Sequence, residues 1–122
     1  MTTAGSDRRR RAQRLPVSAE GRLEGRVPSA VALMDLSLTG CLVRAPRALE
    51  PGAIFDLRVP LEGFELLGKV RVADCSLDGT SAGAAPSWLS GLEFLALPVE
   101  QGERLRQYLD RRRRPGADSP AR

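Results

Sequence analysis

Two groups of polar side chains in this sequence could act together on a nucleotide. The first is an arginine pair, Arg10 and Arg14, within an arginine-rich segment near the start of the chain. A guanidinium presents a planar fork of donors that matches phosphate oxygens, or the O6/N7 edge of guanine, two bonds at a time. Pro16 disfavours helix at the preceding residue, so we expect an extended or turning segment. Taken alone, such a run is also typical of a solvated basic tail.

The second group lies in a short segment from Asp35 to Gly40 that has the composition of a turn. Asp35 and Ser37 can accept hydrogen bonds from nearby backbone N–H groups, and Gly40 tolerates a positive φ. A purely structural connection between strands therefore explains the segment. A functional interpretation is that Asp35 accepts from N1–H or N2–H₂ of guanine while Ser37 reaches a base or phosphate oxygen. A carboxylate in this role would reject adenine, whose corresponding edge offers an acceptor at N1.

The positive charge of the chain is concentrated at its two ends. The net charge is +4. Residues 1–14 and residues 111–122 each carry five arginines and one aspartate, whereas residues 15–110 carry nine Lys/Arg and thirteen Asp/Glu. The body between the tails is therefore net acidic, and this composition does not predict a basic nucleic-acid-binding face.

The sequence lacks the residues on which most hydrolytic and zinc sites depend. It contains no histidine, and this removes His-assisted Ser or Cys nucleophiles, the commonest general base and most zinc sites. The two cysteines, Cys41 and Cys75, have no metal-type spacing and lie in apolar strand-like segments. Small buried hydrophobes are expected there in preference to a disulfide or a reactive thiol. We therefore predict no catalytic residue, no metal ligand and no cofactor.

Six short segments with strand character must position the two polar groups. Residues 19–27 alternate between apolar or small side chains and charged ones, which is typical of a half-buried antiparallel strand. Residues 30–36 are apolar on both faces and predict a strand covered on each side. Further strands are predicted at residues 41–44, 55–59, 66–75 and 88–95, with turns or loops between them. Six strands at this spacing favour a small barrel or sandwich.

The pattern becomes helical after the last predicted strand. Pro98 suits a first helical turn, and Leu105 and Leu109 are four residues apart. Arg111 to Arg114 lie where cations offset the negative end of the helix dipole. We expect this helix to end the folded part of the chain.

These patterns divide the chain into one domain with two polar ends. We expect a flexible arginine-rich arm at residues 1–13, a barrel with its helix at residues 14–112, and a disordered tail at residues 113–122. No apolar run is long enough for a membrane helix, and the basic start lacks the apolar segment of a signal peptide. A soluble, cytoplasmic protein is therefore expected.

Three short motifs, in order along the chain, resemble those of the PilZ domain. They are Arg10-x-x-x-Arg14, Asp35-x-Ser37-x-x-Gly40 and, in the last strand, Gly91-Leu92-Glu93-Phe94. The resemblance covers roughly residues 8–110. It implies a mainly β fold, a six-stranded antiparallel β-barrel with a C-terminal α-helix, that acts as a receptor for the bacterial second messenger cyclic di-GMP.

The resemblance also implies roles for individual residues. Arg10 and Arg14 would contact phosphate and guanine, while Asp35 and Ser37 would contact the ligand from the barrel surface and Gly40 completes their motif. Further candidates for ligand binding, from the flanking arginines and the last strand, are Arg8, Arg9, Arg11 and Gly91.

The implied function is that of a non-catalytic receptor that relays the signal to a partner protein in trans. Binding of one ligand or of a stacked pair stays open, as does a ligand-linked homodimer. Two alternatives differ in class: a PilZ-like interaction adaptor without nucleotide binding, and an arginine-tailed nucleic-acid binder without sequence preference. The intact motifs argue against the adaptor. The acidic body and the few aromatic residues argue against the nucleic-acid binder.

Overall fold

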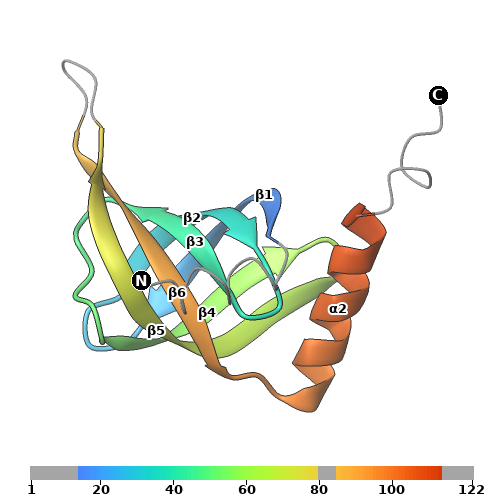
Figure 1. The fold of residues 1–122 in the computed structure, drawn as a ribbon. Coiled ribbons are helices and arrows are strands. Elements are labelled where there is room, and N and C mark those ends of the chain that lie inside the picture. Colours follow the sequence, from blue (N-terminus) through green and yellow to red (C-terminus); the bar gives the residue numbers. More distant parts are fainter. Residues whose placement is uncertain (1–13, 80–84, 114–122) are drawn as a thin grey trace, which may run out of the picture.

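The structure, a computed structural model, describes residues 14–79 and 85–113 (Figure 1). In this part of the chain, antiparallel strands form a closed barrel in the order β1-β2-β3-β6-β5-β4, followed by a helix. The elements are β1 (Leu15–Glu24), β2 (Ser29–Leu36), β3 (Gly40–Ala45), β4 (Ile54–Leu61), β5 (Phe64–Asp78), β6 (Ser87–Ala96) and α2 (Val99–Arg113). The six-stranded antiparallel barrel and its C-terminal helix are confirmed. The predicted arm at residues 1–13 and the tail beyond Arg113 lie outside the described residues.

Alternation along the strands fills the barrel with leucine and valine side chains. In β4, Phe55, Leu57 and Val59 are buried while Asp56 and Arg58 face solvent, as a period of two requires. The largest fully buried side chains include Leu23, Leu33, Leu36, Leu57, Leu66 and Leu105. Over most of the barrel, the core therefore consists of branched aliphatic side chains packed against one another.

Two predictions about the burial of strand residues are wrong. β1 ends at Glu24, and Val27, predicted on the buried face, is 52% exposed. In β2, Ala30 is exposed and Ala32 is half-buried, so the prediction that this strand is covered on both faces is wrong. A closed barrel has a single interior, and the outer face of β2 carries small apolar side chains that need no cover.

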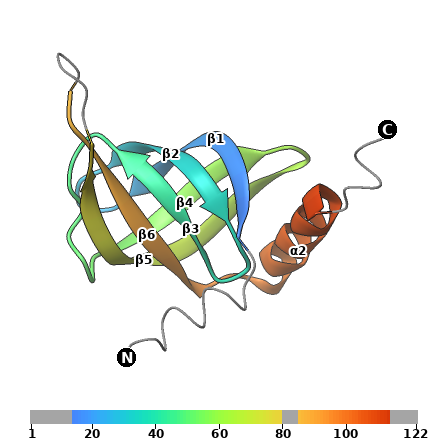
Figure 2. The same cartoon turned by 45° about the horizontal axis from the view of Figure 1, so that its top comes forward.

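The helix α2 packs against one end of the barrel (Figure 2). Its buried side chains are Leu105, Tyr108 and Leu109, and the ring of Phe64 meets that of Tyr108 edge-on with centroids 6.0 Å apart. Arg112 lies 5.5 Å from the Tyr108 ring and donates to the Pro16 carbonyl at 3.4 Å. The helix therefore contacts the start of β1. Within the described residues, no helix has the length and apolar character needed to cross a membrane.

The strand register brings three distant segments to the same region. At the start of β1, Pro16 is paired with Asp35 at the end of β2. At the start of β3, Gly40 is paired with Glu93 of β6. The residue before β1, the β2–β3 turn and the middle of β6 are therefore neighbours, although more than fifty residues separate the first from the last.

The alternation in β5 predicts opposite outcomes for two adjacent leucines. Leu66 is fully buried, whereas Leu67 is 36% exposed. We expect Leu66→Ala to lower the free energy of unfolding by about 2–5 kcal/mol, because it leaves a cavity in the core. Leu67→Ala is the matched control and should cost less than about 1 kcal/mol. Urea denaturation of both variants measures the difference, and equal midpoints would contradict the assigned register.

Candidate functional site

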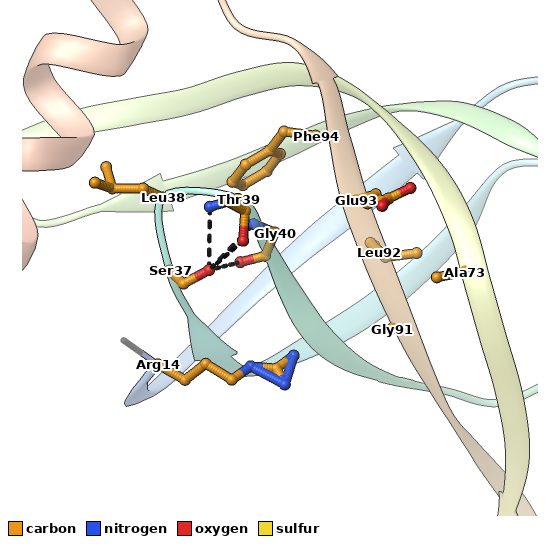
Figure 3. A pocket seen from close by; sticks show the side chains of 10 residues that line it. All are labelled: Arg14, Ser37, Leu38, Thr39, Gly40, Ala73, Gly91, Leu92, Glu93 and Phe94. Atoms are coloured by element: carbon orange, nitrogen blue, oxygen red, sulfur yellow. Dashed lines mark hydrogen bonds between the residues drawn. The ribbon is translucent and has the colours of Figure 1, made fainter. Parts of the chain in front are cut away.

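A pocket of about 450 Å³ lies where the residue before β1, the β2–β3 turn and strands β5 and β6 meet (Figure 3). Its lining combines one cation and one carboxylate with polar, small and apolar residues. The residues are Arg14, Ser37, Leu38, Thr39, Gly40, Ala73, Gly91, Leu92, Glu93 and Phe94. Here Arg14, the described residue of the first predicted motif, lies beside residues of the second motif. The volume lies within the range of roughly 300–1,000 Å³ that is usual for small-molecule sites.

The hydroxyl of Ser37 holds the β2–β3 turn in shape. Ser37 Oγ accepts from the backbone N–H of Thr39 at 3.1 Å and of Gly40 at 3.2 Å, and it donates to the Gly40 carbonyl at 3.2 Å. The Ser37 N–H also donates to the Gly40 carbonyl, at 2.9 Å. The side chain is 2% exposed. These bonds satisfy the buried polar groups of a turn that carries the pocket wall.

Gly40 is required by the closeness of β6. A Cβ atom at this position would lie 2.1 Å from the Leu92 carbonyl oxygen, a distance no real contact reaches. The positive φ that the turn composition suggests for Gly40 is absent: among the described glycines, φ is positive at Gly52 and Gly63. The glycine therefore serves close approach of two backbones, not an unusual turn conformation.

Arg14 and Asp35 form a loose ion pair at the pocket edge. Arg14 Nε lies 3.4 Å from Asp35 Oδ1, and the two side chains are 31% and 21% exposed. The separation satisfies the distance for an ion pair, but the geometry is not that of a hydrogen bond, and Asp35 Oδ1 is buried without a hydrogen-bond partner. Asp35 does not line the pocket itself. Asp35 pairs with an arginine that lines the pocket, and its Oδ1 atom can still accept a hydrogen bond.

The floor and far wall of the pocket come from β5 and β6. Gly91 donates its backbone N–H to Asp74 Oδ1 at 3.2 Å, and a Cβ at Gly91 would lie 3.1 Å from the same atom. The register shifts between Val72 and Asp74, so Ala73 is the extra residue of a bulge. Beside them, Glu93 is paired with Arg71 at 2.8 Å.

The structure places five of the predicted site residues in or beside this pocket. Arg14, Ser37, Gly40 and Gly91 line it, and Asp35 contacts Arg14. Arg8, Arg9, Arg10 and Arg11 lie outside the described residues, so their predicted roles stay predictions.

Sequence reasoning missed Thr39, Ala73 and Glu93 as lining residues. Thr39 accepts from the Phe94 N–H through its carbonyl at 2.9 Å, and so ties the turn to β6. Glu93 stands inside the quoted Gly91–Phe94 motif, which was the available signal for it. Ala73 depends on a bulge, for which the sequence offers no local signal.

Neither cysteine supplies a reactive group to the site. Both are free, Cys41 buried and Cys75 partly buried. Burial foremost, and then the nearby Asp35 carboxylate, raise the pKa of the Cys41 thiol to about 12. Among the described residues, no cluster of histidine, cysteine or carboxylate side chains could hold a metal ion.

Comparison with known proteins agrees with the fold and with the predicted family. The family model described as "PilZ domain" matches residues 8–111. No curated protein matches the sequence significantly.

Solved structures with a similar fold include three PilZ or motility proteins. The PilZ domain of YcgR from Escherichia coli, solved with c-di-GMP, superposes with a TM-score of 0.70 at 19% identity, over 91% of this chain and 98% of that one. The Bacillus subtilis inhibitor of motility MotI/DgrA gives 0.72 at 17% identity, over 87% of this chain and 54% of that one. The PilZ domain of CeSA from a cellulose-synthesizing bacterium gives 0.57 at 18% identity, over 81% and 96%.

The contact between β3 and β6 predicts the effect of adding one methyl group. We expect Gly40→Ala to lower the free energy of unfolding by more than about 2 kcal/mol, because backbone must move to admit the Cβ. Gly102→Ala is the control, since a Cβ at that position in α2 would meet no atom within 4 Å, and it should cost less than about 1 kcal/mol. Chemical denaturation compares the two, and a tolerant Gly40 would contradict the geometry.

The environment of Cys41 predicts slow thiol chemistry. With its pKa near 12, Cys41 stays protonated at pH 8, so the native protein should react with a disulfide reagent at Cys75 first and at Cys41 only on unfolding. Labelling of Cys41→Ser and Cys75→Ser variants measures each thiol alone. Equal native labelling rates would contradict this prediction.

The raised pKa of Cys41 also affects stability. Because the folded pKa is raised, the contribution of this thiol to stability is complete below pH 9 and is lost progressively from pH 9 to about 12.

Proposed function

The chain belongs to the PilZ domain family, and from this premise we propose that it is a non-catalytic receptor for cyclic di-GMP. The observation that carries the proposal is the convergence of two motifs at one pocket. Arg14, from the arginine motif, lines the pocket and lies 3.4 Å from Asp35, which belongs to the second motif. A structural neighbour that spans nearly the whole chain is a PilZ domain solved with c-di-GMP.

Arg14 is the residue we assign to a ligand phosphate or to the O6/N7 edge of guanine. Its present pairing with Asp35 is partly exposed and lacks hydrogen-bond geometry. Pairs of this kind contribute about 0–1 kcal/mol, so a phosphate can recruit the guanidinium at small cost. Charge-assisted bonds to phosphate, worth about 1.5–3 kcal/mol each, exceed that cost.

Arg10 is assigned to the same ligand from the arm that precedes β1. Ordering that arm costs about 1–2 kcal/mol per residue in backbone entropy. Several arginine–phosphate bonds are therefore needed to offset it, which makes the flanking Arg9 and Arg11 useful contributors. Binding would then change the surface that the arm presents, and this supplies a route for the signal to a partner protein in trans.

Asp35 and Ser37 are assigned different parts in binding. Asp35 has an oxygen without a hydrogen-bond partner next to Arg14, which supports a role as acceptor for a guanine N–H once the arginine turns to phosphate. The Ser37 hydroxyl is engaged with the turn, so its main contribution is to fix the pocket wall, together with Gly40.

The proposal predicts binding that depends on the motif arginines. In calorimetry at low salt, the wild-type chain should bind cyclic di-GMP, and Arg14→Ala or Arg10→Ala should weaken the affinity by about tenfold or more, the loss of one charge-assisted bond. Arg58→Ala is the matched control. Arg58 is half-exposed and paired with Glu65 at 3.4 Å, away from the pocket, and its removal should leave the affinity unchanged.

Two results would count against the proposal. Absence of binding at tens of micromolar cyclic di-GMP would favour the adaptor, in which the fold is kept without a ligand. Binding of arbitrary nucleic acid with a steep salt dependence, unaffected by Asp35→Asn, would favour the arginine-tailed nucleic-acid binder.

A further inference from the structure

The β2–β3 turn places two hydroxyl groups in the lining of the pocket, those of Ser37 and Thr39. Ser37 is buried, whereas Thr39 is exposed. Their oxygens lie 3.2 Å apart, and either hydroxyl can be the donor in this contact. Figure 3 shows the two side chains side by side at the turn. The hydroxyl whose proton is not used within the turn is the one that can bond to a ligand.

The Ser37 hydroxyl has more neighbours than it can bond at once. Its Oγ lies 3.1 Å from the Thr39 backbone nitrogen and 3.2 Å from each of three atoms: the Gly40 nitrogen, the Gly40 carbonyl oxygen and Thr39 Oγ1. A hydroxyl has one proton to donate and two lone pairs to accept with. The two backbone N–H groups take both lone pairs, because a turn N–H left without an acceptor is costly. One proton then remains for two possible acceptors.

Either position of the Ser37 proton leaves the Thr39 proton free. If Ser37 donates to the Gly40 carbonyl, its oxygen has no lone pair left for the Thr39 hydroxyl. If Ser37 donates to Thr39 Oγ1 instead, Thr39 is the acceptor and keeps its own proton. The Gly40 carbonyl holds its bond from the Ser37 N–H, at 2.9 Å, in both cases. The hydroxyl of this turn with a proton to spare is therefore that of Thr39.

The Thr39 backbone is fixed on both sides of its side chain. Its N–H donates to Ser37 Oγ within the turn, and its carbonyl accepts from the Phe94 N–H of β6 at 2.9 Å. A β-branched side chain on a fixed backbone has few rotamers to lose when it binds. The hydroxyl is therefore a preorganised donor, which lowers the entropic cost of a bond to a ligand.

We propose that the Thr39 hydroxyl donates a hydrogen bond to a non-bridging phosphate oxygen of the ligand. The proposal rests on the proposed function, since it assumes that cyclic di-GMP occupies the pocket. A charged phosphate oxygen is a stronger acceptor than the neutral acceptors of a base. Arg14 lies in the same lining and can bond to the same phosphate group. Ser37 then acts as a positioning residue, because it holds the turn from which Thr39 reaches the ligand.

Three substitutions at Thr39 test for the bond. Thr39→Val replaces the hydroxyl with a methyl group of similar size, and Thr39→Ala removes the hydroxyl without adding one. In calorimetry at low salt, both should weaken the binding of cyclic di-GMP by about tenfold. Thr39→Ser keeps the hydroxyl and should stay within about threefold of the wild type. Because Thr39 is exposed, urea denaturation should show all three variants folded.

Phosphorothioate analogues of cyclic di-GMP identify the acceptor atom. Sulfur accepts hydrogen bonds weakly, so the diastereomer that presents sulfur to Thr39 should bind the wild-type chain several-fold more weakly than cyclic di-GMP. In Thr39→Val this difference should shrink, because the hydroxyl that distinguishes oxygen from sulfur is gone. The 7-deazaguanine analogue lacks the base acceptor N7. Its affinity relative to cyclic di-GMP should be the same in the wild type and in Thr39→Val.

Ser76→Ala is the control for the loss of an exposed hydroxyl. Ser76 lies on β5, is exposed and does not line the pocket. Its substitution should leave the affinity for every analogue unchanged.

The outcomes separate this inference from the function on which it rests. If the wild-type chain does not bind cyclic di-GMP, the proposed function is wrong and the inference falls with it. If the wild type and Thr39→Val bind cyclic di-GMP equally, Thr39 only shapes the turn. If Thr39→Val binds weakly but keeps the full difference between oxygen and sulfur, the hydroxyl does not bond to the phosphate, and the inference is wrong while the function stands.

Discussion

The approach of the β3 backbone to the β6 backbone at Gly40 is the constraint from which the site follows. The Cβ of any other residue would overlap the Leu92 carbonyl, so this pair of strands closes on a glycine. The pairing of β3 with β6 joins β1, β2 and β3 to β6, β5 and β4, and it is needed to close the barrel. It also fixes the distance between the β2–β3 turn and β6. The pocket lies beside this turn.

The same contact explains why the turn must be internally satisfied. Ser37 is nearly inaccessible to water, and the backbone groups around it would be costly to leave unbonded at about 1–3 kcal/mol each. The serine hydroxyl accepts from the backbone N–H groups of Thr39 and Gly40 and donates to the Gly40 carbonyl. A second link runs from the Phe94 N–H to the Thr39 carbonyl. The pocket wall is therefore fixed before any ligand arrives, which lowers the cost of binding.

The sequence predicted the elements of the fold well because their signals are local. Alternation in residues 55–59 and helical spacing at Leu105 and Leu109 need no knowledge of the partner strand. Contacts between distant segments have no such signal. The bulge at Ala73, the solvent exposure of Val27 and the true reason for Gly40 all depend on which strand lies alongside. For the site, motif order along the chain predicted that Arg14 and Asp35 act together, and it did not mark Glu93 as a lining residue.

The positive charge of the chain lies mainly before and after the barrel, whereas the described pocket lining carries one cation and one carboxylate, Arg14 and Glu93. Residues 15–110 are net acidic, and an arginine-rich segment precedes them. A net basic barrel would repel that segment and would also bind any polyanion. Under the proposed function, a ligand with both a phosphate and hydrogen-bond donors would gain bonds from Arg14 and from Asp35. The proposed selectivity for a guanine nucleotide over other anions would then rest on the scarcity of fixed positive charge in the pocket, where Arg14 is the one cation among the described lining residues.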